Sequence, residues 1–252
     1  MSLLKIMYRL KYFFSKEIEI DDIIFPDKNL AIAIAIERKK YNSISEIEKL
    51  RLSNIKNLNL EGLQRLSSVT TLDIVECEVI NAIPLMQMFN VDDLNLYKNK
   101  GIDYNILTSL YNLKNLIIAD PKLKNISFLK ELVQLEFLYI CTNSIEDIST
   151  LKYLKNLKGL DISENPILDC SPIVELENLE ELELEDLGLT NVEFLSNLKK
   201  LTLLDLSKNN ILDLTPLKQL ENLQTLYLGD FSGNMVSILS DLQNTNINIE
   251  NN

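Results

Sequence analysis

The sequence contains no histidine, and its three cysteines and six glycines are widely scattered. Histidine is the commonest general base near neutral pH and the commonest metal ligand. Its absence excludes most catalytic triads and most zinc sites. Cys77, Cys141 and Cys170 form no CxxC pair and are odd in number, which predicts free thiols rather than a disulfide framework. No glycine-rich phosphate-binding loop is present.

Positive charge is also scarce. The 252 residues include 25 Lys and Arg against 37 Asp and Glu, a net charge of -12. Binding to nucleic acid phosphates needs the opposite sign, so we expect no nucleic acid partner. An acidic surface instead favours a partner with basic features.

Long apolar runs are missing as well. No stretch approaches the roughly 18 apolar residues that span a bilayer. The opening MSLLKIMYRLKYFF is apolar but interrupted by Lys5, Arg9 and Lys11, and no clear apolar core or cleavage site of an export signal follows. As it reads, the sequence predicts a cytoplasmic protein; a truncated N-terminus would make a secreted or surface-exposed one possible.

Residues 1–16 form a basic amphipathic lead. They carry a charge of +4 without any acid, while the rest of the chain carries -16. On a helix one apolar stripe would hold Leu3, Ile6, Met7, Leu10, Phe13 and Phe14. Such a helix can lie on an anionic membrane or pack onto the rest of the N-terminal cap. We favour packing, and membrane binding remains the alternative.

Self-similarity with a period of 22 residues dominates the rest of the sequence. Nine units begin at Ile47, Val69, Val91, Leu113, Leu135, Leu157, Leu179, Leu201 and Leu223. A short strand, Ile247-Asn248-Ile249, follows them. The fourth position of every unit is leucine, the sixth is leucine or isoleucine, and the seventeenth is leucine except for Ile173. Three apolar columns kept over nine units indicate a leucine-rich repeat.

The spacing within a unit predicts its structure. The segment L-x-x-L-x-L is typical of a short strand whose alternate residues point inward, where they stack on the next unit. Apolar residues three apart in the back half suit a 3₁₀ or short α turn. Seven units carry Asp or Asn at position thirteen as a cap for that turn: Asn81, Asp103, Asn125, Asp147, Asp169, Asn191 and Asp213. Position nine holds a turn-bonding Asn in four units, and Cys77 replaces it in another.

The repeats need caps at their ends. We expect a basic lead and a cap over residues 1–46, and leucine-rich repeats over 47–252. The run LAIAIAIE from Leu30 is ambiguous, because its alternation favours a strand and its alanines favour a helix. Pro26 and Asp27 before it fit the start of a helix. The predicted fold class is an α/β, right-handed leucine-rich-repeat solenoid, with a parallel sheet on its concave face and 3₁₀ or short α turns on its convex face.

Three segments together resemble the bacterial internalins over roughly residues 18–250. They are IFPDKNLAIAIAIE (24–37), SEIEKLRLSNIKNLNLEGLQRLSSVTTLDI (45–74) and the 22-residue repeats with the pattern xxLxLxxNxIxDIxPLxxL. The resemblance implies a helical cap, a curved solenoid with parallel strands inside the curve, and protein recognition by the concave face. It favours a helix for the ambiguous run.

Positions three, five, seven and eight of each unit point to the predicted concave face. In the middle units they hold Tyr97, Ile117, Ala119, Phe137, Tyr139 and Cys141. Neighbouring strands lie about 4.8 Å apart, so we expect one patch. Exposed aromatics on a strand are typical interface anchors, and the alternative is an incidental patch.

An acidic field is expected beside this patch. Glu181, Glu183 and Glu185 alternate out of one strand, and Asp161 and Asp205 flank them on neighbouring strands, with Asp186 nearby. Like charges on adjacent strands destabilise a sheet. A basic partner would relieve the repulsion; a solvated acidic face is the plainer interpretation, and a Ca²⁺ ion is the least favoured.

The function that follows is non-catalytic protein binding through the concave face, by a monomer without a metal or cofactor. An open sheet face offers no closed pocket in which to raise the pKa of a catalytic carboxyl. Two alternatives stay open. One is an intracellular scaffold or regulatory subunit, similar in repeat length to phosphatase-regulating repeat proteins. The other is a membrane-surface protein held by residues 1–16.

Overall fold

The computed structural model describes residues 18–229 and 246–249. It divides into two compact units, Met1–Asn112 and Leu113–Asn252, and each is described by itself. The basic lead of residues 1–16 lies outside the described residues, as does most of the back half of the unit that begins at Leu223. The division into cap and repeats at residue 46 therefore stays a prediction.

The first unit opens with a hairpin and a helix. Strand β1 (Ile18–Ile20) pairs antiparallel with β2 (Ile23–Phe25), and helix α2 covers Lys28–Glu37. The Asp27 carboxylate caps the helix by accepting the N–H of Leu30 at 2.7 Å. The helix predicted for the ambiguous run is thus confirmed. Its inner side is fully buried at Leu30 and Ile34, while Ile36 on another side is 57% exposed.

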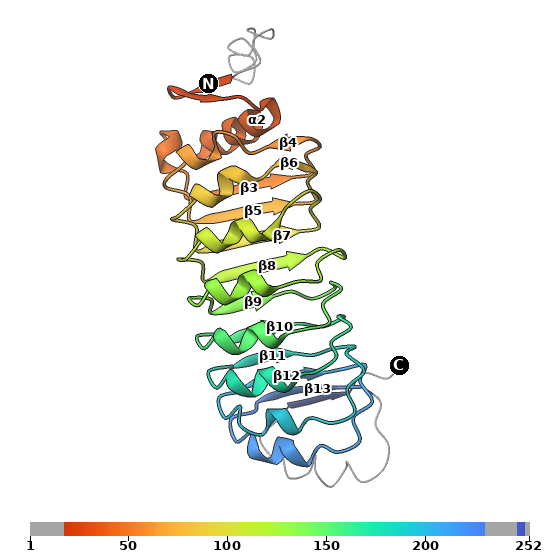
Figure 1. Ribbon diagram of the computed structural model, residues 1–252. Coiled ribbons are helices and arrows are strands. Elements are labelled where there is room, and N and C mark those ends of the chain that lie inside the picture. Colours follow the sequence, from red (N-terminus) through yellow and green to blue (C-terminus); the bar gives the residue numbers. More distant parts are fainter. Residues whose placement is uncertain (1–17, 230–245, 250–252) are drawn as a thin grey trace. The chain divides into compact units, whose positions relative to one another are not determined.

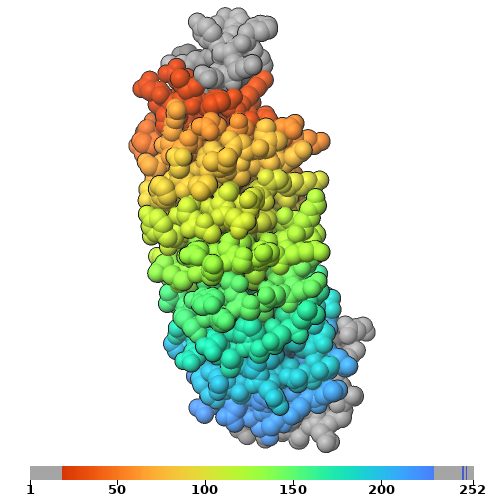
Figure 2. All heavy atoms as spheres, viewed as in Figure 1, coloured from red at the N-terminus to blue at the C-terminus, as the bar shows by residue number. Residues whose placement is uncertain are grey.

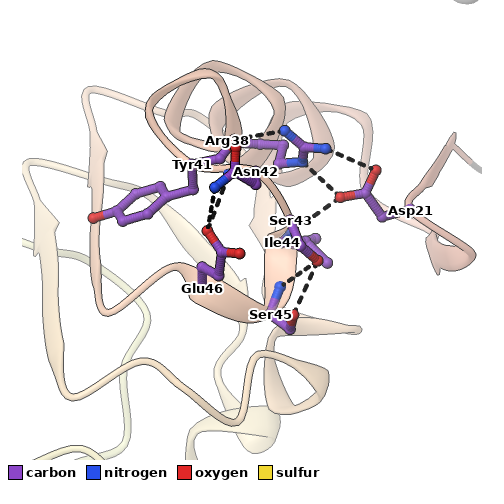
Figure 3. A network of polar contacts seen from close by, with 8 residues as sticks. All are labelled: Asp21, Arg38, Tyr41, Asn42, Ser43, Ile44, Ser45 and Glu46. Atoms are coloured by element: carbon purple, nitrogen blue, oxygen red, sulfur yellow. Dashed lines mark hydrogen bonds and ion pairs between the residues drawn. The ribbon is translucent and has the colours of Figure 1, made fainter.

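Polar contacts hold the parts of this cap together (Figure 3). The Asp21 carboxylate in the hairpin turn accepts Nε–H of Arg38 at 2.6 Å and the backbone N–H of Ile44 at 2.9 Å. The same guanidinium donates to the Tyr41 carbonyl at 2.7 Å, and Glu46 accepts the backbone N–H of Asn42 at 3.0 Å. The hairpin, the end of the helix and the approach to the first repeat strand are held as one body.

Parallel strands follow in the first unit, each one repeat after the last. They are β3 (Lys49–Ser53), β5 (Thr71–Val75) and β7 (Asp93–Tyr97), with Leu50, Leu72 and Leu94 in register. A second small sheet joins β4 (Leu58–Asn59) to β6 (Val79–Asn81). The 3₁₀ helices are Arg38–Lys40, Ile44–Glu46, Leu63–Arg65, Ile83–Gln87 and Tyr104–Ser109.

The second unit repeats this plan, and its strands after β8 are shorter (Figure 1). In chain order its parallel strands are β8 (Asn115–Ala119), β9 (Phe137–Tyr139), β10 (Gly159–Asp161), β11 (Glu181–Glu183), β12 (Leu203–Leu206), β13 (Thr225–Leu228) and β14 (Asn246–Ile249). Each pairs with the next. The 3₁₀ helices are Ser127–Glu131, Ser149–Tyr153, Ser171–Glu175, Glu193–Leu195 and Thr215–Gln219. Strand β14 confirms the short strand predicted after the repeats.

The core lies between the strands and the 3₁₀ helices. The leucines of position four, such as Leu138, Leu160 and Leu182, are at most 2% exposed. Each stacks on its equivalent in the next strand, so every repeat buries its apolar face against its neighbours. Figure 2 shows the result within each unit, where the repeats follow one another as bands in sequence order. The predicted leucine-rich-repeat solenoid is confirmed.

Buried asparagines hold the turns after the strands. Asn165 accepts the N–H of Ile145 at 3.1 Å and donates to the Ile140 carbonyl at 2.8 Å. Cys77 stands in for Asn, since its thiol donates to the Leu52 carbonyl at 3.6 Å. Burial raises the pKa of this thiol, which keeps it protonated as a donor. The cysteines are free thiols, as predicted.

The expected caps of the back half are present as well. At position thirteen a side-chain oxygen accepts the backbone N–H two residues later, as in the 2.7 Å bond from Ser149 to Asp147. This bond lowers the pKa of the Asp147 carboxyl. Within the described residues six of the seven predicted positions make it, namely Asn81, Asp103, Asn125, Asp147, Asp169 and Asp213. Asn59 of the first repeat makes it too, at 2.9 Å, although it was not among the predicted caps.

Candidate protein-binding surface

We call the side of the sheet that faces away from the 3₁₀ helices the open face. Alternation places position four of each strand in the core and positions three and five on this face. In the second unit Phe137, Tyr139, Glu183 and Asp205 are half-buried there, and Glu181 is exposed. These five predicted site residues therefore lie on one surface, on strands β9, β11 and β12.

A glycine lies between the aromatic and the acidic residues of that surface. Gly159 on β10 lies between Phe137 on β9 and Glu181 on β11 in the register. A Cβ placed on Gly159 would lie 2.6 Å from Cδ1 of Phe137 and 3.4 Å from Oη of Tyr139. Both aromatic side chains therefore lean from β9 over the backbone of β10, toward the glutamates of β11. No role of this glycine was predicted from the sequence.

The next row of the register holds Tyr139, Asp161, Glu183 and Asp205 on consecutive strands. Partial burial raises the pKa of the Tyr139 hydroxyl, and the charges of Glu181, Glu183 and Asp161 raise it further. The Tyr139 hydroxyl is therefore close enough to the carboxylates of β11 for their charge to act on it.

Glu183 is the electrostatic centre of the surface. Burial is the largest cause that raises the pKa of its carboxyl from 4.5 to about 7, and the charges of Asp161, Asp205, Glu181 and Glu185 contribute the rest. The repulsion foreseen from the sequence is thus present. A cation that approaches this carboxyl would stabilise its charged form.

Two members of the predicted acidic field are already engaged by the chain. Glu185 lies beyond β11 and forms an ion pair with Lys208 at 2.5 Å. Asp161 is only 9% exposed; it accepts the N–H of Ser163 at 2.9 Å and the thiol proton of Cys141. Burial and this carboxylate raise the pKa of the Cys141 thiol to about 12. Asp161 therefore contributes its charge to the surface rather than an open contact.

The predicted aromatic patch has members in both units. Ile117 on β8 is the register partner of Tyr139, so it extends the surface within the second unit. Ala119 is only 2% exposed and adds little to it. Tyr97 belongs to β7 of the first unit, where Nζ of Lys98 lies 4.8 Å from its ring centre. This cation covers part of the ring that we expected to be open.

Two cavities of the second unit are lined by other residues. One, of about 360 Å³, runs along the strand starts past Glu136, Lys158, Glu180 and Lys200; Lys158 pairs with Glu136 at 2.6 Å. The other, of about 430 Å³, lies among later turns and includes Leu168, Leu187 and Phe194. The described residues include no group of three or more His, Cys, Asp or Glu side chains that could hold a metal ion. Among them, no helix is long and apolar enough to cross a membrane.

No protein-family model and no curated protein matches the sequence. Solved structures do match. Internalin InlC2 of Listeria monocytogenes is 28% identical, and the match covers 81% of this chain and 94% of that one with a TM-score of 0.74. The chain is an internalin-like leucine-rich-repeat protein.

More distant neighbours share the fold of this internalin-like protein. A leucine-rich-repeat protein of Leptospira interrogans is 23% identical over 81% of this chain and 62% of that one, with a TM-score of 0.62. The plant peptide hormone receptor RGFR1, solved in complex with RGF2, is 19% identical over 83% of this chain and 45% of that one, with a TM-score of 0.57. At these identities the similarity concerns the fold alone.

Proposed function

We propose that this internalin-like protein is a non-catalytic binding module that takes a protein partner on the open face of its second unit. From the sequence, this is the face expected to be concave. The observation that carries the proposal is the contact of Phe137 and Tyr139 with Gly159, which brings two aromatic rings beside the glutamates of β11. The partner would be a protein with a basic surface.

The aromatic half of the surface supports an interface. Phe137 and Tyr139 are neither in the core nor fully solvated. Side chains of this kind supply large, rigid contact area and are enriched among the residues that dominate binding energy. Their neighbour Ile117 adds apolar area on β8. A partner would bury all three together.

The acidic half supports a partner of positive charge. Carboxylates that face one another on adjacent strands repel, and at about 4 Å the cost in bulk water is roughly 1 kcal/mol for each pair. A basic side chain placed beside Glu183 would remove this repulsion. Complementary charge also speeds the encounter of two proteins, so the field has a use before contact as well as in the complex.

A binding role fits the fold. Among the solved structures of similar fold, RGFR1 is in complex with RGF2 and PEPR1 with AtPEP1. An open sheet built from many repeats offers an extended surface for such a ligand. The absence of catalysis and the monomeric state are parts of the same proposal.

The test is capture of binding proteins by the immobilised full chain, compared with a Phe137→Ala, Tyr139→Ala double variant. Tyr153→Ala is the matched control, because Tyr153 is 52% exposed and lies on a 3₁₀ helix. We expect a basic protein that the control retains and the double variant loses. A protein retained equally by all three would place the binding site elsewhere.

A further inference from the structure

We propose that the group anchored between these rings and carboxylates is an arginine side chain of the partner. This inference rests on the proposed function and specifies the chemistry of its contact. It concerns a surface of five residues, called here the aromatic–acidic surface: Phe137, Tyr139, Gly159, Glu181 and Glu183.

The register gives this surface its layout. The rings of Phe137 and Tyr139 extend from β9, and the carboxylates of Glu181 and Glu183 extend from β11. The intervening strand β10 places Gly159 in register with Phe137 and Glu181. Strands are spaced about 4.8 Å apart, so the two outer strands lie about two spacings from each other. The rings lean into that interval over Gly159. A flat group lying against the rings would have its edge directed at Glu181 and Glu183.

A guanidinium group can contact the aromatic rings and the carboxylates at the same time. Its planar face stacks on an aromatic ring, and its N–H groups fork to carboxylate oxygens in the plane. A lysine ammonium is a compact, strongly hydrated charge that cannot stack in this way. An apolar side chain would cover the rings but would leave the carboxylates to repel one another.

Glu181 and Glu183 take part in none of the ion pairs that the structure describes in the second unit. Its ion pairs within the described residues are Lys130–Glu131, Lys155–Glu175, Lys158–Glu136 and Lys208–Glu185. Lys208, the lysine on the strand turn next to them, is held by Glu185. The charge that would balance the surface is therefore supplied from outside.

The buried carboxylate of Asp161 adds to the negative charge of this surface. This carboxylate is 9% exposed and accepts from Ser163 and Cys141, so it adds a fixed negative charge beneath the contact. The pKa of Glu183, raised to about 7 by burial and these neighbours, means that a bound guanidinium would also displace a proton near neutral pH. Arginine, which keeps its charge throughout this range, suits such a site.

The experiment uses nuclear magnetic resonance on the full chain, above the pKa of Glu183. Acetyl-arginine amide, acetyl-lysine amide and acetyl-citrulline amide are titrated separately, and the Gly159 amide signal is followed. Citrulline has the shape of arginine without its charge. We expect arginine to bind about two- to fivefold more tightly than lysine, and citrulline to cause no saturable shift.

Variants separate the two halves of the contact. A Phe137→Leu, Tyr139→Leu variant should lower arginine affinity to that of lysine, and Glu183→Gln should weaken both. Glu175→Gln is the control, because Glu175 is exposed and pairs with Lys155 at 2.7 Å away from this surface; it should change neither affinity.

Equal arginine and lysine affinities, both lost in Glu183→Gln, would overturn the arginine anchor and leave the basic-partner proposal standing. Citrulline binding as tightly as arginine, or no saturable shift with arginine, would also overturn the anchor. The proposed function itself is tested separately by the capture experiment. It fails if the Phe137→Ala, Tyr139→Ala variant captures the same proteins as the unchanged chain.

Discussion

The ring of Phe137 rests on the backbone of Gly159, so closely that a Cβ at position 159 would lie 2.6 Å from its Cδ1. The two residues are register partners on β9 and β10. This packing determines where the aromatic side chains of the open face lie. It also makes the position of the rings testable without changing any charge or any aromatic residue.

Gly159→Ala should weaken partner binding while the fold survives. Alanine in a strand loses less conformational entropy than glycine, by roughly 0.5–1 kcal/mol, and the half-buried ring of Phe137 can turn outward to admit a methyl group. We therefore expect a change in unfolding free energy of at most about 1 kcal/mol. Chemical denaturation measures this, and partner affinity is measured beside it. Unchanged affinity would show that the position of the rings over Gly159 has no part in binding.

Leu182→Ala should be far more costly than Tyr139→Ala. Leu182 is fully buried, and removing a close-packed leucine typically costs about 2–5 kcal/mol because a cavity remains. Tyr139 is half-buried on the open face, where water can fill the space that it leaves. Chemical denaturation of both variants compares them directly. Equal losses would contradict the assignment of inner and outer positions.

The stability of the protein should depend on pH through Glu183. Its pKa is about 7 in the folded protein against an ordinary value of 4.5. Between these values the folded state keeps the proton and the unfolded state releases it. The contribution of Glu183 to stability is therefore complete below about pH 4.5 and is lost as the pH rises to about 7.

Glu183→Gln should remove this loss. We expect the variant to be more stable than the wild type above about pH 7, and its unfolding free energy to fall less between pH 4.5 and 7. Denaturant titrations across this range provide the measurement. Glu175→Gln should not remove the loss, because the nearby Lys155 lowers the pKa of Glu175. An identical pH profile for wild type and Glu183→Gln would refute the account of this carboxyl.

Charge reversal at Glu183 should act mainly on the rate of association. Surface charge steers the encounter of oppositely charged proteins, and salt screens this effect. Glu183→Lys should slow association with a basic partner and flatten its dependence on ionic strength. Stopped-flow mixing at several salt concentrations measures both. A rate that stays equally sensitive to salt would mean that steering arises elsewhere.

Much of the fold was predictable because each repeat contacts only its neighbours, so the same residue spacing recurs in every unit. Apolar columns at positions four and six identified the strands, and Asp147 and its equivalents identified the turns that they cap. The helix at Leu30 was less certain. Its alternation of isoleucine and alanine suits a strand, whereas its alanine content, the preceding Pro26 and Asp27 and the resemblance to internalins favoured a helix. The cap bond from Leu30 to Asp27 shows which signal mattered.

The surface was predictable only in part. Alternation placed Tyr139 and Glu183 on one face, because that depends on strand periodicity alone. The pairing of Glu185 with Lys208 and the burial of Asp161 depend on how side chains settle across strands. Sequence position does not give that information. Gly159 was the one available signal for the lean of the rings, since glycine is unusual within a strand and often marks a close approach.

The most direct test of the central claim is the affinity of the captured partner for single variants of the open face. Calorimetry should show that Phe137→Ala and Tyr139→Ala each weaken binding by at least about 1–2 kcal/mol, as central aromatic anchors do. Tyr153→Ala, on the 3₁₀ side, should leave the affinity unchanged. Weaker binding for Tyr153→Ala, with no effect of the other two, would contradict the account and place the partner on the opposite side.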